Sequence, residues 1–397
     1  MKKKKIIIGI CLILIIILSV FLYKFIKVKT AKIEVVLVDD LKVNFLDDVK
    51  ISSFIKNING KLIDDAKIDT RKLGKQNIFF EYINDDNIKV KYTFDIEVVD
   101  KIAPVVWLGK SYNVVKGSED NLLDKILCGD NYDDNPVCEI IGDYNLNEVG
   151  SYSLVFKATD SSGNVTEKNF SLNVNEPKKN QVGTTESTKI SFSDVVKDYK
   201  TNKNEIGIDV SKWQGDIDFE KLKNAGVEFI IIRVGSSSGK NGENFVDSKF
   251  VQNIQNANAA GIPVGIYFYS YASTKKRAIS DAKWIIKQIK DYKVDLPIAF
   301  DWENWNSFNS FDLSFFSLTE MATSFLDTLK DAGYEGMLYS SKTHLENIWF
   351  DTSYPVWLAH YTKNTNYSGK YEYWQLCSNG KVDGIDADVD INIRYLD

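Results

Sequence analysis

The chain has 397 residues, of which 44% are hydrophobic and 13% aromatic, enough for more than one folded domain. Its formal net charge of −6 gives no reason to expect a nucleic-acid partner. The only histidines are His344 and His360. This excludes most zinc hydrolases, whose metal is held by several histidines, and leaves little basis for Ser-His or Cys-His catalysis. We therefore expect no metal and no cofactor.

Residues 1–28 are predicted to anchor the chain in a membrane. Four lysines precede residues 6–23, a run of 18 residues without a charge. At about 1.5 Å per residue a helix of this length spans roughly 27 Å, close to the thickness of the hydrocarbon layer. The lysines favour a cytoplasmic N-terminus, which makes the protein a single-pass protein of the cell membrane with its later domains outside. The alternative is a cleaved signal peptide, although no small-residue cleavage site follows the run.

Residues 31–100 and 101–176 are predicted to form two small all-β domains. Residues 73–98 align with residues 149–174 at an offset of 76, and each segment has two alternating strands around a polar turn. This pattern is typical of a β-hairpin. The second copy also contains IAPVV and DSSGN. On these motifs the copies resemble immunoglobulin-like domains of bacterial surface proteins, which implies that they act as a spacer.

The cysteines allow one disulfide in the second copy. Cys128 and Cys138 flank the acidic stretch GDNYDDNPV and can close a small loop in an oxidising compartment. Acidic oxygen ligands suit calcium, but they follow no fixed spacing here, so a solvated loop is the prediction. Cys377 lies in an apolar run and is predicted to be buried.

Residues 205–397 alternate between apolar strand-like runs and amphipathic helical runs. This alternation predicts a parallel sheet covered by helices on both faces. Eight strands suggest closure into a (β/α)8-like barrel, and the short connections after residue 341 predict reduced late helices. Residues 177–204 are polar and are predicted to be a linker. The predicted strands are 206–210, 229–235, 263–272, 297–303, 336–341, 355–361, 371–377 and 388–393.

Four acids are predicted to meet at one end of this barrel. Asp209, Asp301 and Glu303 fall at the C-terminal ends of their strands, where barrel enzymes place their active sites. Asp390 lies in the last strand, which neighbours the first in a closed barrel. Asp301 and Glu303 share one face because side chains alternate along a strand, so Trp302 points the other way and is predicted to pack. Crowding raises the pKa of at least one acid, and a protonated acid beside an ionised one can cleave a glycosidic bond.

Aromatic side chains near the strand ends agree with a sugar substrate, because the apolar faces of sugar rings stack on aromatic rings. The alternative for each of them is a place in the barrel core. The predicted substrate-binding residues are Tyr267, Trp357, Tyr361, Trp374 and Gln375.

Five motifs occur in order: GIDVSKWQG (207–215), DWE (301–303), PVWLAHY (355–361), YWQ (373–375) and DVDIN (388–392). Together they resemble glycoside hydrolase family 25, the lysozymes that cut between N-acetylmuramic acid and N-acetylglucosamine. The resemblance covers essentially the whole last domain.

The resemblance implies a role for each acid. Glu303 is the general acid, and Asp301 is the partner carboxylate that orients the acetamido group or stabilises charge at the anomeric carbon. Asp209 and Asp390 hold the sugar and tune the other two. Asp390 is preferred to Asp388 because its D-x-N pattern ends in an asparagine. Either an enzyme carboxylate or the N-acetyl group of the substrate can then attack the sugar.

The predicted function is a membrane-anchored, extracytoplasmic N-acetylmuramidase whose partners are peptidoglycan glycan strands and the membrane. The alternative is a non-catalytic wall-binding or scaffold protein on the same fold. The presence of all four acids weighs against it. A chitinase-like barrel would need a longer D-x-x-D-x-D-x-E pattern, of which only DWE is present.

Overall fold

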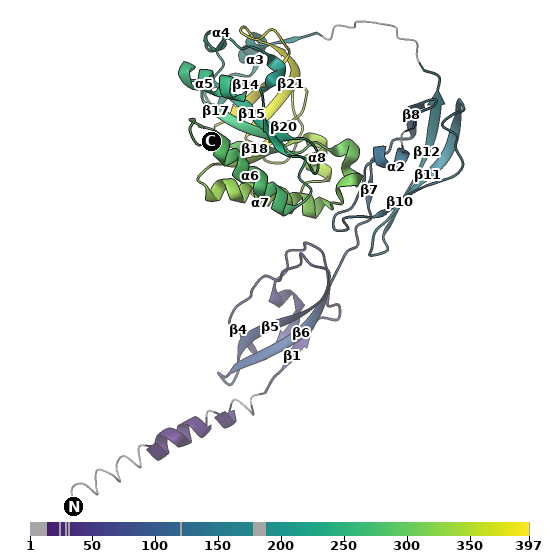
Figure 1. Cartoon of the computed structure of the whole chain (residues 1–397). Coiled ribbons are helices and arrows are strands. Elements are labelled where there is room, and N and C mark those ends of the chain that lie inside the picture. The colour runs from purple at the N-terminus through teal and green to yellow at the C-terminus, as the bar shows by residue number, and fades with distance from the viewer. Residues whose placement is uncertain are drawn as a thin grey trace, which may run out of the picture. The chain divides into compact units, whose positions relative to one another are not determined.

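The computed structural model describes residues 14–23, 25–27, 30, 32–119, 121–177 and 188–396 (Figure 1). The chain divides into two compact units, Met1–Lys101 and Ile102–Asp397. Residues 14–23 and 25–27 are helical. In the part of the chain that is described, no helix is long and apolar enough to cross a membrane. Residues 1–13, which include the start of the predicted anchor, lie outside that part.

The first unit contains a four-stranded sheet in the order β2-β6-β5-β4. Its centre is the predicted hairpin of β5 (Gly74–Asn84) and β6 (Lys89–Val99), in which alternate side chains such as Phe80 are buried. The remaining elements are β1 (Val35–Leu37), β2 (Lys42–Asn44), η1 (Ile51–Phe54), β3 (Ile55–Ile58) and β4 (Gly60–Leu62).

The second β-domain begins the second unit and repeats this hairpin. Its strands β11 (Gly150–Thr159) and β12 (Val165–Asn175) pair with Gly150 opposite Val174, just as Gly74 lies opposite Val98 in the first hairpin. The predicted 76-residue repeat of the hairpin is therefore confirmed, while an immunoglobulin-like class for the two domains stays a prediction. The remaining elements are β7 (Val105–Val106), β8 (Ser111–Val115), α2 (Leu122–Lys125), β9 (Cys128–Gly129) and β10 (Val137–Ile141).

The linker predicted for residues 177–204 is wrong in its second half. Strand β13 (Ile190–Ser191) pairs with the barrel, and α3 (Phe192–Tyr199) places Phe192 and Val195 in the barrel core. The helix has only about two turns and lies in a segment that is polar as a whole, so residues 177–204 resemble a linker in composition. Residues 178–187 lie outside the described residues.

All eight predicted barrel strands are present and form a closed, barrel-like sheet (Figure 1). Seven run parallel, but the last, β22, is antiparallel to both of its neighbours, β14 and β21. The prediction of parallel strands fails there because only residues 382–388 connect β21 to β22, and a parallel crossover needs about a dozen residues or more. The strands are β14 (Asn204–Val210), β15 (Phe229–Ser237), β17 (Val264–Tyr269), β18 (Ile298–Asp301), β19 (Gly336–Ser341), β20 (Val356–Ala359), β21 (Tyr373–Lys381) and β22 (Val389–Tyr395).

Helices cover the outside of the early strands, as predicted, and the late helices are reduced. Only the short helix α8 follows β19, and within the described residues no helix lies between β20 and β22. The helices are α4 (Phe219–Asn224), α5 (Phe250–Ala260), α6 (Lys275–Ile289), α7 (Phe315–Asp331) and α8 (Lys342–Asn347). The remaining elements are η2 (Lys212–Gln214), β16 (Asn244–Val246) and η3 (Trp305–Phe311).

Candidate active site

The structure brings the four predicted acids together at one end of the barrel. Asp209, near the end of β14, lies directly opposite Asp390 of the neighbouring strand β22. Asp301 ends β18, and Glu303 follows it by two residues. Asp388, the rejected alternative to Asp390, forms ion pairs with lysines away from these acids.

Asp209 and Asp390 form one coupled pair. Oδ2 of Asp209 accepts hydrogen bonds from Nε2 of Gln375 at 2.9 Å and Nδ2 of Asn392 at 2.8 Å. Burial raises the pKa of Asp209 to about 6, although the two amides favour its charged form. Burial and the neighbouring charge of Asp209 raise the pKa of Asp390 to about 9. The pair therefore retains a proton at a higher pH than two separate carboxyl groups would.

Asp301 and Glu303 form a second coupled pair. Asp301 is 3% exposed, and burial raises its pKa well above the ordinary value, with a further contribution from the charge of Glu303. Solvent reaches the Glu303 side chain, but the surrounding protein atoms reduce its hydration enough to raise its pKa too. Its hydrogen bond with Asp301 acts in the opposite direction. Burial therefore favours a proton on one acid of this pair.

Asp301 also has an open hydrogen-bonding position. Its Oδ1 atom is buried and has no hydrogen-bond partner among the described residues. A buried carboxylate oxygen without a partner is costly, so this atom is suited to a donor on a bound molecule.

Two amide side chains fix Asp209 from inside the barrel. Oε1 of Gln375 accepts hydrogen bonds from the hydroxyls of Tyr339 and Tyr361, at 2.9 and 3.0 Å, while its amino group donates to Asp209. Gln375 is 3% exposed. Its side chain therefore holds Asp209 from a buried position, while its predicted contact with substrate stays a prediction.

Trp357 and Trp374 are also packing residues in the structure. Trp357 is 1% exposed, and its indole N–H donates to Asn392 at 2.8 Å. Trp374 is 3% exposed and donates to the carbonyl of His360. Both rings are enclosed and both N–H groups are in use, which favours packing, while their predicted contact with substrate stays a prediction.

The other two predicted binding residues are better placed for a ligand. Tyr361 follows β20 and is 57% exposed. Tyr267 is half-buried and packs edge-on against Trp357, and burial, followed by the charges of Asp209, Asp301 and Asp390, raises its pKa. Trp302 is fully buried and donates to the carbonyl of Ala272, in agreement with its predicted packing role.

Sequence reasoning missed three side chains near the acids. Trp213 is 70% exposed in η2, which follows the strand of Asp209, and the Lys212 ammonium lies 4.8 Å from its ring centroid. Arg233 lowers the pKa of Asp301 through its charge. The third is Tyr339, described above. Trp213 lies inside the motif GIDVSKWQG, but the sequence alone does not show that its ring is exposed.

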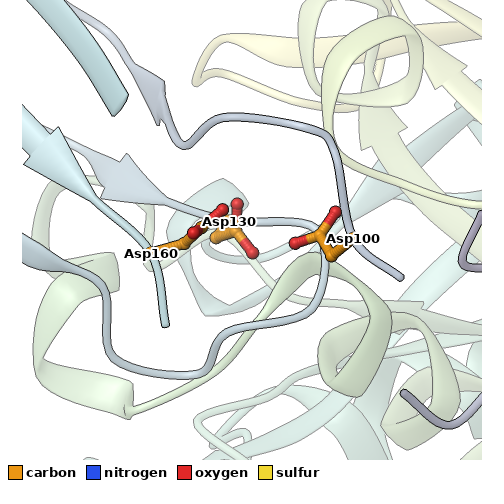
Figure 2. A group of neighbouring side chains, drawn as sticks. All are labelled: Asp100, Asp130 and Asp160. Atoms are coloured by element: carbon orange, nitrogen blue, oxygen red, sulfur yellow. The ribbon is translucent and has the colours of Figure 1, made fainter. Parts of the chain in front are cut away.

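Outside the barrel, Figure 2 shows a group of acids formed by Asp130 and Asp160 of the second β-domain together with Asp100. One carboxylate oxygen of each lies within 4.8 Å of the others. Oxygen ligands of this kind suit a hard cation. Acidic groups also gather without an ion, so we assign no metal to this group.

Known proteins resemble the C-terminal half of the chain. Residues 208–385 match the model of glycosyl hydrolases family 25. The uncharacterized protein YegX of Escherichia coli K12 is 28% identical over 192 residues, which cover 47% of this chain and 68% of YegX. The autolytic lysozyme of Clostridium acetobutylicum is 25% identical over 47% of this chain and 54% of its own length. Lysozyme M1 of Streptomyces globisporus is 28% identical over 47% of this chain and 66% of its own length.

Among solved structures, the autolysin LytC of Streptococcus pneumoniae, in complex with a synthetic peptidoglycan ligand, matches with 26% identity and a TM-score of 0.44. The match covers 61% of this chain and 56% of that one. The family match includes Asp209, Asp301 and Glu303 and ends at residue 385, before Asp390. The chain therefore carries a glycosyl hydrolase family 25 domain, the domain of lysozyme-type glycoside hydrolases.

Proposed function

We propose that this protein is a membrane-anchored, extracytoplasmic N-acetylmuramidase, which hydrolyses the β-1,4 bond between N-acetylmuramic acid and N-acetylglucosamine in peptidoglycan. One observation carries the proposal: solvent-accessible Glu303 stands beside buried Asp301, and both pKa values are raised. Cleavage of a glycosidic bond uses two carboxyl groups in this way, one as a proton donor and one as a partner for the developing positive charge.

In the proposed reaction Glu303 donates its proton to the glycosidic oxygen as the bond from that oxygen to the anomeric carbon breaks. Asp301 accepts from the acetamido group of the substrate or stabilises the positive anomeric carbon, and its open Oδ1 atom supports this role. Water then supplies a hydroxyl to the anomeric carbon and returns a proton to Glu303.

Asp209 and Asp390 hold the sugar and set the charge of the cleft. Protonated Asp390 has an O–H to donate, while the two amides keep Asp209 in its acceptor form. The exposed rings of Tyr361 and Trp213 offer apolar faces for sugar rings.

The first test identifies the bond that is cut. Purified peptidoglycan digested with the wild-type chain is expected to release soluble muropeptides with N-acetylmuramic acid at the new reducing end. Borohydride reduction followed by mass spectrometry identifies that sugar. A reducing N-acetylglucosamine would contradict the proposed bond. Sedimentation with the wall and no release would favour the non-catalytic scaffold.

The second test concerns the anchor. We expect the full chain to stay in the membrane fraction after a carbonate wash, because residues 6–23 form an uncharged run of sufficient length. A variant that lacks residues 1–30 is expected to move to the soluble fraction. A wild-type protein found soluble, with a mass reduced by the N-terminal segment, would establish cleavage and contradict anchoring.

A further inference from the structure

We propose that the second β-domain (101–176) positions the loop that carries Glu303, and is thus part of the catalytic apparatus instead of a spacer; this rests on the proposed function. The catalytic loop is defined here as residues 302–314, between β18 and α7. The β-domain contributes the disulfide loop, residues 128–138, closed by the bond between Cys128 and Cys138. The disulfide that the sequence allowed is present, and the loop is docked against the barrel.

Asn309 is the centre of the contact between the two loops. Its Oδ1 atom accepts the backbone N–H of Cys128 at 3.0 Å. Its Nδ2 atom donates to the carbonyls of Leu123 and Ile126, at 2.7 and 2.9 Å. One side chain of the catalytic loop thus satisfies three backbone groups of the β-domain, a geometry that fixes position because each bond has a defined direction.

The far end of the catalytic loop is also held by the β-domain. The first N–H groups of an α-helix lack partners within the helix. At the start of α7 the N–H groups of Phe315 and Phe316 donate to the carbonyls of Asp130 and Asn131, at 2.8 and 3.1 Å. The β-domain therefore caps this helix of the barrel.

A carboxylate of the disulfide loop adds to this cap. Oδ1 of Asp134 accepts from the N–H of Ser314 and the hydroxyl of Ser317, both at 2.7 Å. Its negative charge lies where the helix dipole favours an anion. Close packing supports the cap, since a Cβ atom added to Gly129 would lie 2.6 Å from the ring of Phe315.

A third contact lies next to Glu303. The ring of Trp305 stacks on His344 with ring centroids 3.9 Å apart, and His344 also contacts Trp107 of the β-domain at 4.8 Å. Burial lowers the pKa of His344 to about 4, so the central ring is neutral at ordinary pH. The tilted ring of Trp107 therefore links the β-domain, through His344, to the side chain two residues after Glu303.

These contacts divide the support of Glu303 between two parts of the chain. On the barrel side, Trp302 and Asn304 donate to the carbonyls of Ala272 and Ser270. Beyond Asn304, the β-domain contacts described above are joined by barrel contacts, since Lys240 pairs with the carbonyl of Ser310 and with Asp312, and Trp302 packs on the rings of Phe308 and Phe311. A displacement of about 1 Å in a catalytic group can lower the rate about 10²-fold, so partial release of the loop is expected to reduce kcat.

The test compares Asn309→Ala with Asn169→Ala in the full chain. Asn169 is an exposed residue of β12 in the same β-domain and serves as the matched control. We expect Asn309→Ala to increase the rate of backbone hydrogen exchange in residues 303–314 and to lower kcat about ten-fold, with KM changed less than about two-fold. The control is expected to match the wild type in all three measurements.

A second variant tests the donated hydrogen bonds. Asn309→Asp keeps the acceptor for Cys128 but sets a carboxylate oxygen against the carbonyls of Leu123 and Ile126, so its exchange and kcat are expected to change at least as much as in Asn309→Ala. Thermal unfolding curves of both variants show whether the chain remains folded. Unchanged exchange in both variants would overturn the proposed contact. Faster exchange with unchanged kcat would overturn the positioning role. An inactive wild type would refute the proposed function, and the exchange measurement would still decide whether the β-domain holds the loop.

Discussion

Glu303→Gln is expected to lower kcat on peptidoglycan by about 10²–10⁴-fold while the protein remains folded. Glutamine preserves the size of the side chain, but its amide cannot transfer a proton to the glycosidic oxygen, and general acid catalysis contributes about this factor. The fold is expected to tolerate the change because solvent reaches the side chain and glutamine has nearly the same size. Release of reducing ends from purified walls and a thermal unfolding curve measure the two effects.

Glu335→Gln is the matched control for this variant. Glu335 is exposed and directly precedes β19, so it lies at the end of the barrel opposite to the acids. We expect the control to retain wild-type kcat. Full activity in Glu303→Gln would remove Glu303 from the role of general acid and direct attention to Asp301, the other acid whose pKa burial raises.

The barrel and its acids could be predicted because both depend on local patterns. Apolar runs of strand length separated by amphipathic runs identified all eight strands, and the position of each acid at the end of such a run identified the rim. Alternation placed Asp301 and Glu303 on one face with Trp302 on the other, as the burial of Trp302 shows. The antiparallel direction of β22 follows from the short connection formed by residues 382–388. The prediction of a parallel barrel was based on the number of strands and did not consider the length of this connection.

The roles of the aromatic and amide side chains could not be predicted in the same way. Alternation tells which side chains point into a closed barrel, but it does not tell how far along the barrel axis each one lies. Trp357 and Tyr373 point inward below the rim and pack there, whereas Tyr361 follows the strand and is exposed. Gln375 was predicted to bind substrate for the same reason, although it lies one layer beneath Asp209.

The docking of the second β-domain left no signal in the sequence. Most of its hydrogen bonds to the barrel involve backbone groups, such as the carbonyls of Asp130 and Asn131, which every residue type possesses. The side chains that take part, Asn309 and Asp134, are polar residues in segments that read as solvated loops. Their partners lie about 180 positions away in the sequence, at separations that no periodic pattern covers.

Asp390→Asn is expected to stabilise the fold at pH 8 by at least about 2 kcal/mol, since each unit of pKa shift corresponds to about 1.4 kcal/mol. Burial and Asp209 raise the pKa of Asp390 in the folded protein to about 9, whereas the unfolded chain ionises at the ordinary acid value near 4. Between these values the folded state holds a proton that the unfolded state has lost. The contribution of Asp390 to the free energy of unfolding is therefore fully present below about pH 4 and is lost as the pH rises toward 9.

Asparagine removes this dependence because its side chain is neutral at every pH. The melting temperature of the variant is expected to exceed that of the wild type by roughly 4–8 °C at pH 8. The difference is expected to shrink toward pH 4. Asp209, whose pKa is about 6, continues to lower stability between about pH 4 and 6 in both proteins, although less strongly in the variant, where it lacks a negative neighbour.

Asp388→Asn distinguishes this effect from a general loss of negative charge. Asp388 precedes Asp390 by two residues but is ion-paired with Lys189 and Lys381, and these contacts lower its pKa. Its removal is expected to leave the melting temperature at pH 8 unchanged or slightly lower, because the charged form is the one that the fold favours. If Asp390→Asn behaves in the same way, Asp390 is ionised in the folded protein at pH 8. It then has no proton to donate to the sugar, and its role in the cleft is that of a second negative charge beside Asp209.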